Sequence, residues 1–291
     1  MAHWIGRIAA ESFGFELVNV VVRDTPSGPL LFGDPEIPRS VPLADVCAMA
    51  TPADLLICNP VFSNFGLGRK FPGRSICYVQ GIRTFELLDK FTHYVSVSVA
   101  AANCLSAVYD VRSRVIPPFY TPFPEDLRRR RWEDKKNAIL VIDKQNTELQ
   151  QAGLRHTIDA IRRCCRSVEL TILPPYSLPR EPYSLAIAEP RFVLAFSPVE
   201  GFGLMPLEAM ACGAVVLGLN GVGGRDYMKP GINCLTVEWL DYEKIATLAA
   251  EAVNDQALCL RISDAAKETA AQYTPERFMA SWRTELELVL A

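Results

Sequence analysis

Short apolar runs alternate with longer amphipathic segments along most of this chain. Runs of strand length, which predict buried strands, cover 16–22, 54–59, 75–80, 94–99, 138–142, 168–173, 191–197 and 214–218. Apolar positions with helical periodicity predict helices over 3–13, 100–109, 148–165, 241–254, 256–272 and 275–290. An alternation of strands and helices is typical of parallel sheets covered by helices. The sequence therefore predicts an α/β fold.

A proline-punctuated stretch and a charged run separate the chain into two halves. The stretch is 119–124 (FYTPFP), and the run is 125–136 (EDLRRRRWEDKK). Domain boundaries fall in such exposed, polar segments. We therefore expect one domain over 1–124 and a second over 125–274, followed by a terminal helix over 275–291. The Pro- and Gly-rich residues 24–42 are expected to form a loop.

The segment 197–213 (SPVEGFGLMPLEAMACG) is the most informative part of the chain. Gly201 and Gly203 allow a tight turn and a close approach of a ligand to the backbone. Pro206 suits the first turn of a helix, and Gly213 suits its end. Apolar runs precede and follow, so the segment predicts a parallel strand–turn–helix–strand unit. Such units bind ligands at the carboxyl ends of their strands.

Glu208 is the only charged side chain between Leu204 and Cys212. A helix that is apolar on every side is expected to be buried. A carboxylate buried with it needs polar partners, because an unpaired buried charge is very costly. A basic residue such as Arg225 or the hydroxyl groups of a ligand could supply them. The glycine turn, the helix and the spacing to Glu200 together favour the ligand.

The helix start and its two glutamates fit the layout of a nucleotide diphosphate sugar. Free N–H groups and the helix dipole favour phosphate at a helix start. The candidate donors are the backbone amides of Gly201, Phe202, Gly203 and Leu204. Glu208 lies about five residues into the helix, on the order of 7 Å along its axis, whereas Glu200 precedes it. The two carboxylates could therefore accept hydrogen bonds from hydroxyl groups at opposite ends of the ligand.

Composition and charge argue against several other classes of protein. The 291 residues are 49% hydrophobic with a net charge of −3, which fits two ordinary cores and argues against a nucleic-acid partner. The three histidines form no ligand-spaced cluster, so no metal site is expected. Nine scattered cysteines without C-x-x-C spacing fit reduced thiols in the cytoplasm. We expect neither a transmembrane helix nor a signal peptide.

The two glutamates and their surroundings resemble the E-x7-E motif of retaining GT-B glycosyltransferases, especially those of family 4. The resemblance runs from Pro198, before the first glutamate, to Cys212 and Gly213, after the second. Further on, 223–227 (GGRDY) resembles the family's Gly-Gly-x-x-Glu turn, and 230–235 (PGINCL) resembles the start of its next strand. The likeness covers 137–291 well and the first half only loosely.

The resemblance implies a GT-B-like fold, in which two Rossmann-like domains face each other across a cleft. The first domain is expected to be reduced, because the family's usual opening strand and glycine-rich loop are absent from this sequence. The terminal helix over 275–291 is expected to pack back on that domain. The implied reaction transfers a sugar with retention at the anomeric carbon, and it needs no bound metal and no cofactor besides the nucleotide-sugar donor.

The resemblance also implies roles for individual residues. Glu200 is expected to position the sugar hydroxyls and, with Lys144, to act in catalysis. Glu208 is expected to hold the ribose. Gln80 and Gly81 stand at the donor-sugar position of the first domain, where many members of the family carry a histidine. Neither glutamate is then a nucleophile, unlike the paired carboxylates of glycosidases.

The leading hypothesis is a glycosyltransferase that passes a sugar from a UDP-, GDP- or dTDP-sugar to a glycan, lipid-linked or other acceptor. Only Lys144 stands where the family usually has two basic residues, which motivates a second hypothesis. This is a weak or inactive GT-B protein that binds a nucleotide sugar or serves as a partner subunit. A sugar-nucleotide epimerase on the same scaffold is a third. The basic run 128–131 (RRRR) fits peripheral contact with anionic lipid at the inner face of a membrane, although such runs are more often solvated helix faces.

Overall fold

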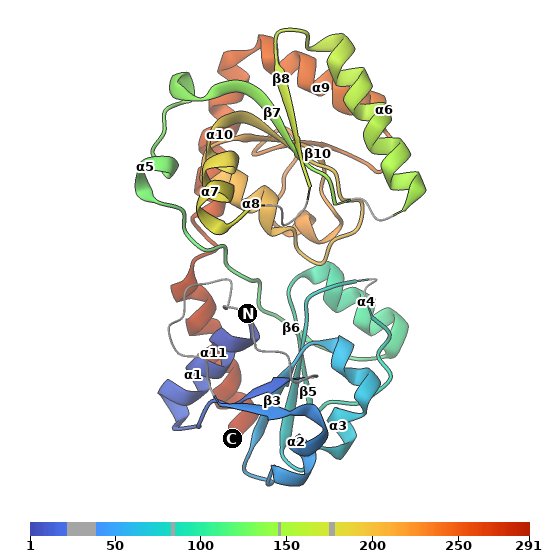
Figure 1. The fold of residues 1–291 in the computed structure, drawn as a ribbon, viewed down its shortest axis with the longest axis vertical. Helices are drawn as coiled ribbons and strands as arrows, with labels where there is room; N and C mark the ends of the chain where they lie inside the picture. The colour runs from blue at the N-terminus through green and yellow to red at the C-terminus, as the bar shows by residue number, and fades with distance from the viewer. Residues whose placement is uncertain (22–38, 83–84, 145–146, 175–177) are drawn as a thin grey trace. The chain divides into compact units, whose positions relative to one another are not determined.

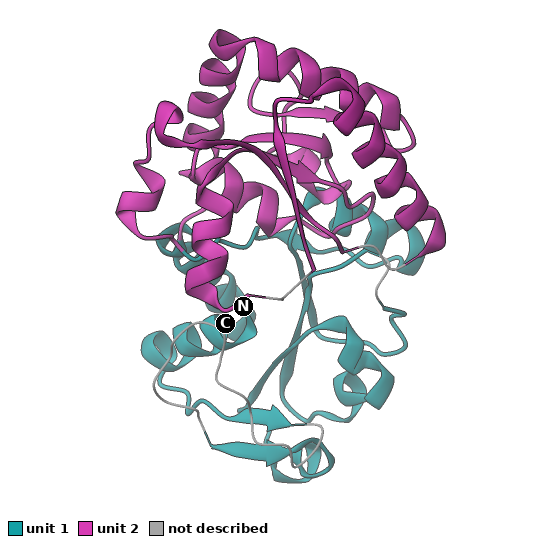
Figure 2. Cartoon of the chain, turned by 45° about the horizontal axis from the view of Figure 1, so that its top comes forward, with its two compact units in different colours: residues 1–121, 275–291 teal, residues 122–274 magenta. Residues whose placement is uncertain are grey.

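The computed structural model describes residues 1–21, 39–82, 85–144, 147–174 and 178–291, and the chain forms two compact units (Figure 2). Unit 1 comprises Met1–Thr121 and Pro275–Ala291, and unit 2 comprises Pro122–Thr274. Both are α/β units built on parallel sheets, as the sequence predicts. Most of the loop expected over 24–42 lies outside the described residues.

The sheet of unit 2 is doubly wound. In the described part of this unit it has five parallel strands in the order β11–β10–β9–β7–β8 (Figure 1). The strands are β7 (Lys136–Ile142), β8 (Glu169–Leu173), β9 (Pro190–Ala195), β10 (Val215–Leu219) and β11 (Leu235–Val237). In chain order the arrangement is 2-1-3-4-5, so the winding direction reverses between β7 and β9.

Helices cover this sheet. They are α5 (Glu125–Arg128), α6 (Glu148–Cys164), α7 (Arg180–Ala188), α8 (Leu204–Ala211), α9 (Tyr242–Asn254) and α10 (Gln256–Ala270), with the 3-10 helices η2 (Trp132–Asp134) and η3 (Gly223–Asp226). Thr147 precedes α6, and its hydroxyl caps the helix by accepting a hydrogen bond from the Gln150 amide at 3.3 Å. The charged run 125–136 contains the short α5 and η2 and ends at the first residue of β7. Within it, Trp132 is buried and packs edge-on against Phe192.

The core of unit 2 lies between its sheet and its helices. Ile139 and Leu194 of the sheet are fully buried with Ile161 of α6 and Ile245 of α9. β9 and β10 are buried on both faces, as their continuous apolar runs predict. This packing fixes the strand ends, and with them the loops that follow the strands.

Unit 1 has a pair of parallel strands and a larger parallel sheet. The pair is β1 (Asn19–Val21) and β2 (Ser40–Pro42), and the sheet has the order β3 (Leu55–Cys58), β4 (Arg74–Val79), β5 (His93–Ser96) and β6 (Arg114–Val115). Its helices are α1 (Ala2–Phe13), α2 (Leu43–Met49), α3 (Leu67–Lys70), α4 (Val99–Tyr109) and α11 (Pro275–Leu290), with the 3-10 helix η1 (Pro60–Phe65).

The last helix, α11, belongs to unit 1 and lies beside α1 (Figure 1). Trp282 of α11 is fully buried, and its ring meets Tyr78 edge-on at a centroid distance of 5.1 Å. Glu285, also buried, pairs with Arg114 at 3.1 Å. Among the described residues, none of the helices is long and apolar enough to cross a membrane.

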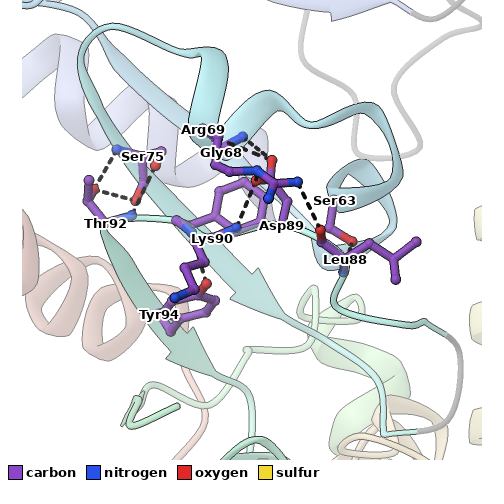
Figure 3. Close-up of polar contacts among 10 residues, drawn as sticks. Ser63, Gly68, Arg69, Ser75, Leu88, Asp89, Lys90, Thr92 and Tyr94 are labelled. Carbon is purple, nitrogen blue, oxygen red and sulfur yellow. Dashed lines mark hydrogen bonds and ion pairs between the residues drawn. The ribbon is translucent and has the colours of Figure 1, made fainter. Parts of the chain in front are cut away.

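Buried polar side chains anchor the segment between β4 and β5 (Figure 3). The Asp89 carboxylate accepts a hydrogen bond from the Gly68 amide at 2.5 Å and pairs with the Arg69 guanidinium at 3.0 Å. The Ser63 hydroxyl donates to the Glu86 carbonyl and accepts from the Leu88 amide, at 2.9 and 3.2 Å. These bonds tie residues 86–89 to η1 and α3.

Candidate functional site

A pocket lies at the carboxyl edge of the unit 2 sheet, where the winding direction reverses. Its lining includes Lys144 after β7, Glu200 and Gly203 after β9, and Asn220 after β10. Doubly wound sheets bind ligands at such a point, because the neighbouring connections leave toward opposite faces of the sheet. The structure therefore brings together three of the residues singled out in the sequence: Lys144, Glu200 and Gly203.

Lys144 and Glu200 form an ion pair across the reversal point. Lys144 Nζ lies 3.5 Å from Glu200 Oε1, and the two side chains are 30% and 22% exposed. A pair this long and this open to solvent contributes little to stability. Both groups keep capacity for other partners, since the ammonium has three donors and the carboxylate about four acceptor sites. The pocket therefore offers a cation for phosphate and an acceptor for hydroxyl groups.

Backbone hydrogen bonds hold Glu200 in this pocket. Its N–H donates to the Gly221 carbonyl at 2.7 Å, and its carbonyl accepts from the Gly223 N–H at 3.2 Å. The two loops approach so closely that a Cβ atom on Gly223 would lie 2.0 Å from the Gly201 carbonyl oxygen. Glycine is therefore required at position 223, which explains the first glycine of the 223–227 turn.

The backbone at Val222 is strained. Its φ and ψ are 65° and −59°, and the Gly223 N–H donates to the Gly221 carbonyl at 2.8 Å. These values define a γ-turn of the rare form, which is unfavourable for a β-branched residue. Asn220 Oδ1 supports the turn by accepting from the Val222 N–H at 3.1 Å. Strain of this kind persists only where surrounding contacts enforce it, and it is commonest at functional sites.

The first turn of α8 lies beside the same pocket. Gly203 precedes the helix with φ 89°, and in the described structure no side chain caps the helix start. Pro206 lacks an N–H, and the Leu207 N–H makes the first hydrogen bond within the helix, so the free donors at this end are those of Gly203, Leu204 and Met205. The Phe202 side chain is buried, with its ring against Tyr227 at a centroid distance of 5.1 Å. Only its backbone amide is then available to a ligand.

Glu208 is buried in α8 as predicted, with 8% of the residue exposed. Its Oε1 accepts from the Arg180 guanidinium at 2.9 Å, and its Oε2 accepts from the Tyr183 hydroxyl at 2.7 Å. Glu208 therefore has the basic neighbour that the sequence analysis weighed against a ligand as its partner. The neighbour is Arg180 and not Arg225, which pairs with Glu238 at 3.1 Å. Glu208 is not among the residues that line the pocket.

Sequence reasoning missed α7 and with it Arg180 and Tyr183. The sequence contains signals for this helix, because Pro179 precedes it and Glu181 falls in its first turn. The Arg180 guanidinium also lies over the Phe123 ring, 4.5 Å from its centroid, in a cation–π contact. The Arg180 side chain thus joins α7 to α8 through its partly buried ion pair with Glu208.

Tyr227 is another residue to which the sequence analysis assigned no role. It lines the pocket, is almost completely buried, and donates a hydrogen bond from its hydroxyl to the Gly203 carbonyl. Burial, and next the nearby Glu200 carboxylate, raise the pKa of this phenol well above its usual value. Tyr227 is therefore neutral at physiological pH and acts as a hydrogen-bond donor.

The other expected site residues lie elsewhere. Gln80 and Gly81 follow β4 in unit 1, and Gln80 is exposed; neither lines the unit 2 pocket. In the basic run, Arg129 pairs with Glu125 at 2.5 Å and Arg131 pairs with Asp134 at 3.0 Å. Within the described residues, no group of three or more His, Cys, Asp or Glu side chains is arranged to hold a metal ion.

A comparison with known protein families gives a match over the part of the chain that contains the pocket. Residues 133–269 match the family model described as glycosyl transferases group 1. Over 75 residues the chain is 39% identical to a protein named as a glycosyltransferase, ORF330 of Acidianus filamentous virus 2. That match covers 24% of this chain and 23% of the viral protein.

Solved structures with the same fold are more distant in sequence. S. aureus TarM, crystallised in one structure with UDP, superposes with a TM-score of 0.64 at 13% identity, over 83% of this chain and 56% of TarM. Anabaena Alr3699/HepE in complex with UDP and glucose gives 0.63 at 14% identity, over 81% of this chain and 77% of HepE. A glycosyltransferase from Rickettsia africae ESF-5 gives 0.65 at 13% identity, over 99% and 93%.

The chain thus spans less than a quarter of the viral relative and little more than half of TarM. Its fold is the α/β fold with parallel sheets found in GT-B glycosyltransferases. Residues 133–269 of that fold, which contain the whole pocket lining, match the group 1 glycosyl transferases.

Proposed function

We propose that this protein is a retaining glycosyltransferase that takes a nucleotide diphosphate sugar as its donor. The observation that carries the proposal is the Lys144–Glu200 pair at the reversal point of a doubly wound sheet, beside the start of α8. A cation, free amides and a carboxylate in one pocket match the phosphates and hydroxyl groups of such a donor. The neighbouring structures that contain UDP, or UDP and glucose, support this class of ligand.

The chemistry of the transfer assigns different tasks to these groups. Breaking the bond between the sugar and the diphosphate places negative charge on the leaving phosphate. Lys144 and the amides at the start of α8 would stabilise this charge, and preorganised donors of this kind are usually the largest contribution to catalysis. Glu200 would hold sugar hydroxyl groups beside the breaking bond. In a retaining transfer the acceptor attacks from the face that the phosphate leaves, so that the phosphate can take the acceptor's proton.

Glu208 retains the capacity to bind ribose despite its protein partners. An ionised carboxylate has about four acceptor sites, and Arg180 and Tyr183 use one on each oxygen. A vicinal diol could occupy the remaining sites. On this proposal Arg180 and Tyr183 orient the carboxylate, and the ribose supplies additional donors.

The acceptor would be a glycan, a glycolipid or another hydroxyl compound. The proposed reaction needs no resident metal ion, because Lys144 and the helix amides supply the positive potential. No cofactor besides the donor is required.

The proposal is tested by a thermal-shift screen with UDP, GDP, dTDP and their sugars, followed by assays of nucleoside diphosphate release. We expect at least one nucleotide to raise the thermal unfolding midpoint of the protein. The corresponding nucleotide sugar should be hydrolysed slowly, with water as the acceptor. Glu200→Gln, which keeps the size of the side chain, should still bind but lose turnover. Binding without turnover under any condition would instead indicate an inactive nucleotide-sugar-binding protein, and absence of binding would refute both.

A further inference from the structure

Three aromatic rings pack against one another at the glycine turn, Gly201–Gly203, that precedes α8. Phe202, within the turn, packs against Tyr227 and Tyr273 at centroid distances of 5.1 and 5.4 Å. Tyr227 and Tyr273 meet at 5.7 Å. The three rings form a closed triangle, so the turn is supported by side chains from three separate parts of unit 2.

Tyr227 adds a directed hydrogen bond to this triangle. Its hydroxyl donates to the carbonyl of Gly203, the residue that precedes α8 with φ 89°. Its own backbone is fixed as well: the Tyr227 N–H donates to the Gly224 carbonyl at 3.0 Å, and the Tyr227 carbonyl accepts from the Asn233 side chain at 2.8 Å. The phenol therefore connects the hydrogen-bonded 223–227 turn with the glycine at the helix start.

We infer that Tyr227 is a positioning residue for the donor site: it holds the Gly201–Gly203 turn so that the first amides of α8 point toward the donor's diphosphate. The inference rests on the proposed function, because it assigns those amides to phosphate. Gly203 has no side chain to restrict its conformation, so the hydrogen bond to its carbonyl supplies that restriction. Preorganised amides assist most when charge develops on the leaving phosphate, so the hydroxyl should matter more for kcat than for donor binding.

The matched variants are Tyr227→Phe and Tyr273→Phe. The first removes the hydroxyl that bonds Gly203 and keeps the ring in the triangle. The second removes a hydroxyl from the same triangle and leaves the Gly203 bond intact. For Tyr227→Phe we expect kcat for donor hydrolysis to fall about tenfold, the effect of one hydrogen bond on a barrier, with KM changed by less than about twofold. Tyr273→Phe should match the wild type in both constants.

The 291-residue chain is assayed with UDP-glucose, GDP-mannose and dTDP-glucose, and the constants are compared on the donor that the wild type turns over fastest. Thermal midpoints are recorded for every variant. If Tyr227→Phe does not fold, Phe202→Leu replaces it, because it loosens the same turn. This variant should likewise lower kcat and leave KM almost unchanged. The inference is overturned if Tyr227→Phe keeps the wild-type kcat. It is also overturned if a lower thermal midpoint alone accounts for the loss of kcat in this variant. A wild type that turns over none of the three donors overturns the proposed function as well.

Discussion

Gly223 has no room for a side chain. Its backbone approaches that of Gly201 so closely that an added Cβ would lie 2.0 Å from the carbonyl oxygen. Gly231 is a useful contrast, because its φ is 76° but nothing lies within 4 Å of an added Cβ. Glycine is therefore required at position 223 for steric reasons, whereas at position 231 it is favoured only by the left-handed backbone conformation.

Gly223→Ala is expected to push the 220–224 loop away from Glu200. Steric overpacking of this kind costs about 1–3 kcal/mol of unfolding free energy, and donor turnover should fall below detection because Glu200 loses its backbone anchors. Gly231→Ala should cost about 1–2 kcal/mol for its left-handed conformation and retain turnover. Urea unfolding and donor hydrolysis measure the two effects. A Gly223→Ala protein with wild-type turnover would contradict the role given to the loop contact.

Lys135 is a buried amine outside the pocket. It is 4% exposed, and its ammonium donates to the Ala188 carbonyl at 2.5 Å. Burial is the main cause that lowers its pKa to about 8 from the usual 10.5. Between these two pH values the unfolded chain binds more protons than the folded chain, so stability should rise with pH across the window.

The pH dependence is tested with Lys135→Met. The wild type should gain up to about 3 kcal/mol of unfolding free energy from Lys135 between pH 8 and pH 10.5, and the variant should lack this gain. Lys136→Met is the matched control, because Lys136 is exposed and its pKa is raised by Glu189. The measurement is the difference between wild-type and variant unfolding free energies at each pH, which cancels tyrosine ionisation. Parallel curves for the wild type and Lys135→Met would refute the assignment.

At the scale of elements, α7 and α8 are joined by the Arg180–Glu208 pair. Arg180 is 34% exposed at its side chain and Glu208 is 10% exposed. Removing one member leaves the other without its counter-charge, and replacing both by apolar residues of similar size is often nearly neutral. The pair therefore allows the structural role of Glu208 to be separated from its proposed ribose contact.

Arg180→Met alone should lower the unfolding free energy, and Arg180→Met/Glu208→Leu should recover much of it. If Glu208 also binds ribose, the double variant will be stable but will bind nucleoside diphosphate about tenfold more weakly, the effect of a lost hydrogen bond to a charged group. Urea unfolding and calorimetric titration provide the two readouts. Wild-type affinity in the stable double variant would show that Glu208 has only a structural role.

The elements around the site could be read from sequence because their signals are local. The apolar runs of β9 and β10, and the glycines between them, predict the strand–turn–helix–strand unit that the structure contains. The partner of Glu208 could not be read, because it depends on which face of α7 meets α8. The hydrogen bond from Tyr227 to Gly203 joins positions 24 residues apart, and no periodicity or spacing reports such a contact.

At the scale of the whole molecule, the chain leaves unit 1 at residue 121 and returns to it at residue 275. The returning helix α11 contributes Trp282 to the unit 1 core, where it meets Tyr78 and Phe278. The alternation of strands and helices was sufficient to predict two α/β units, because each unit uses its own local pattern. The number and order of strands in unit 1 required the structure, since β1 and β2 form a separate pair in its described part.

Trp282→Ala is expected to destabilise unit 1 in particular. Truncating a fully buried tryptophan costs about 3–5 kcal/mol, and the loss should appear as faster hydrogen–deuterium exchange in peptides of β4 and α1. Peptides of β7, β9 and β10 in unit 2 should keep their protection. Leu288→Ala, at a position that is 60% exposed on the same helix, is the control and should change neither unit. Equal loss of protection in both units would contradict the assignment of α11 to unit 1 alone.

The most direct test of the proposed donor site is calorimetric titration of UDP, GDP and dTDP into the wild type, Lys144→Met and Lys136→Met. The two lysines stand near opposite ends of β7, and only Lys144 lines the pocket. We predict that at least one nucleotide binds the wild type and Lys136→Met alike, and that Lys144→Met binds it at least about tenfold more weakly, because a charge-assisted contact to phosphate is lost. Equal binding by all three proteins, or no binding by any, would contradict the account.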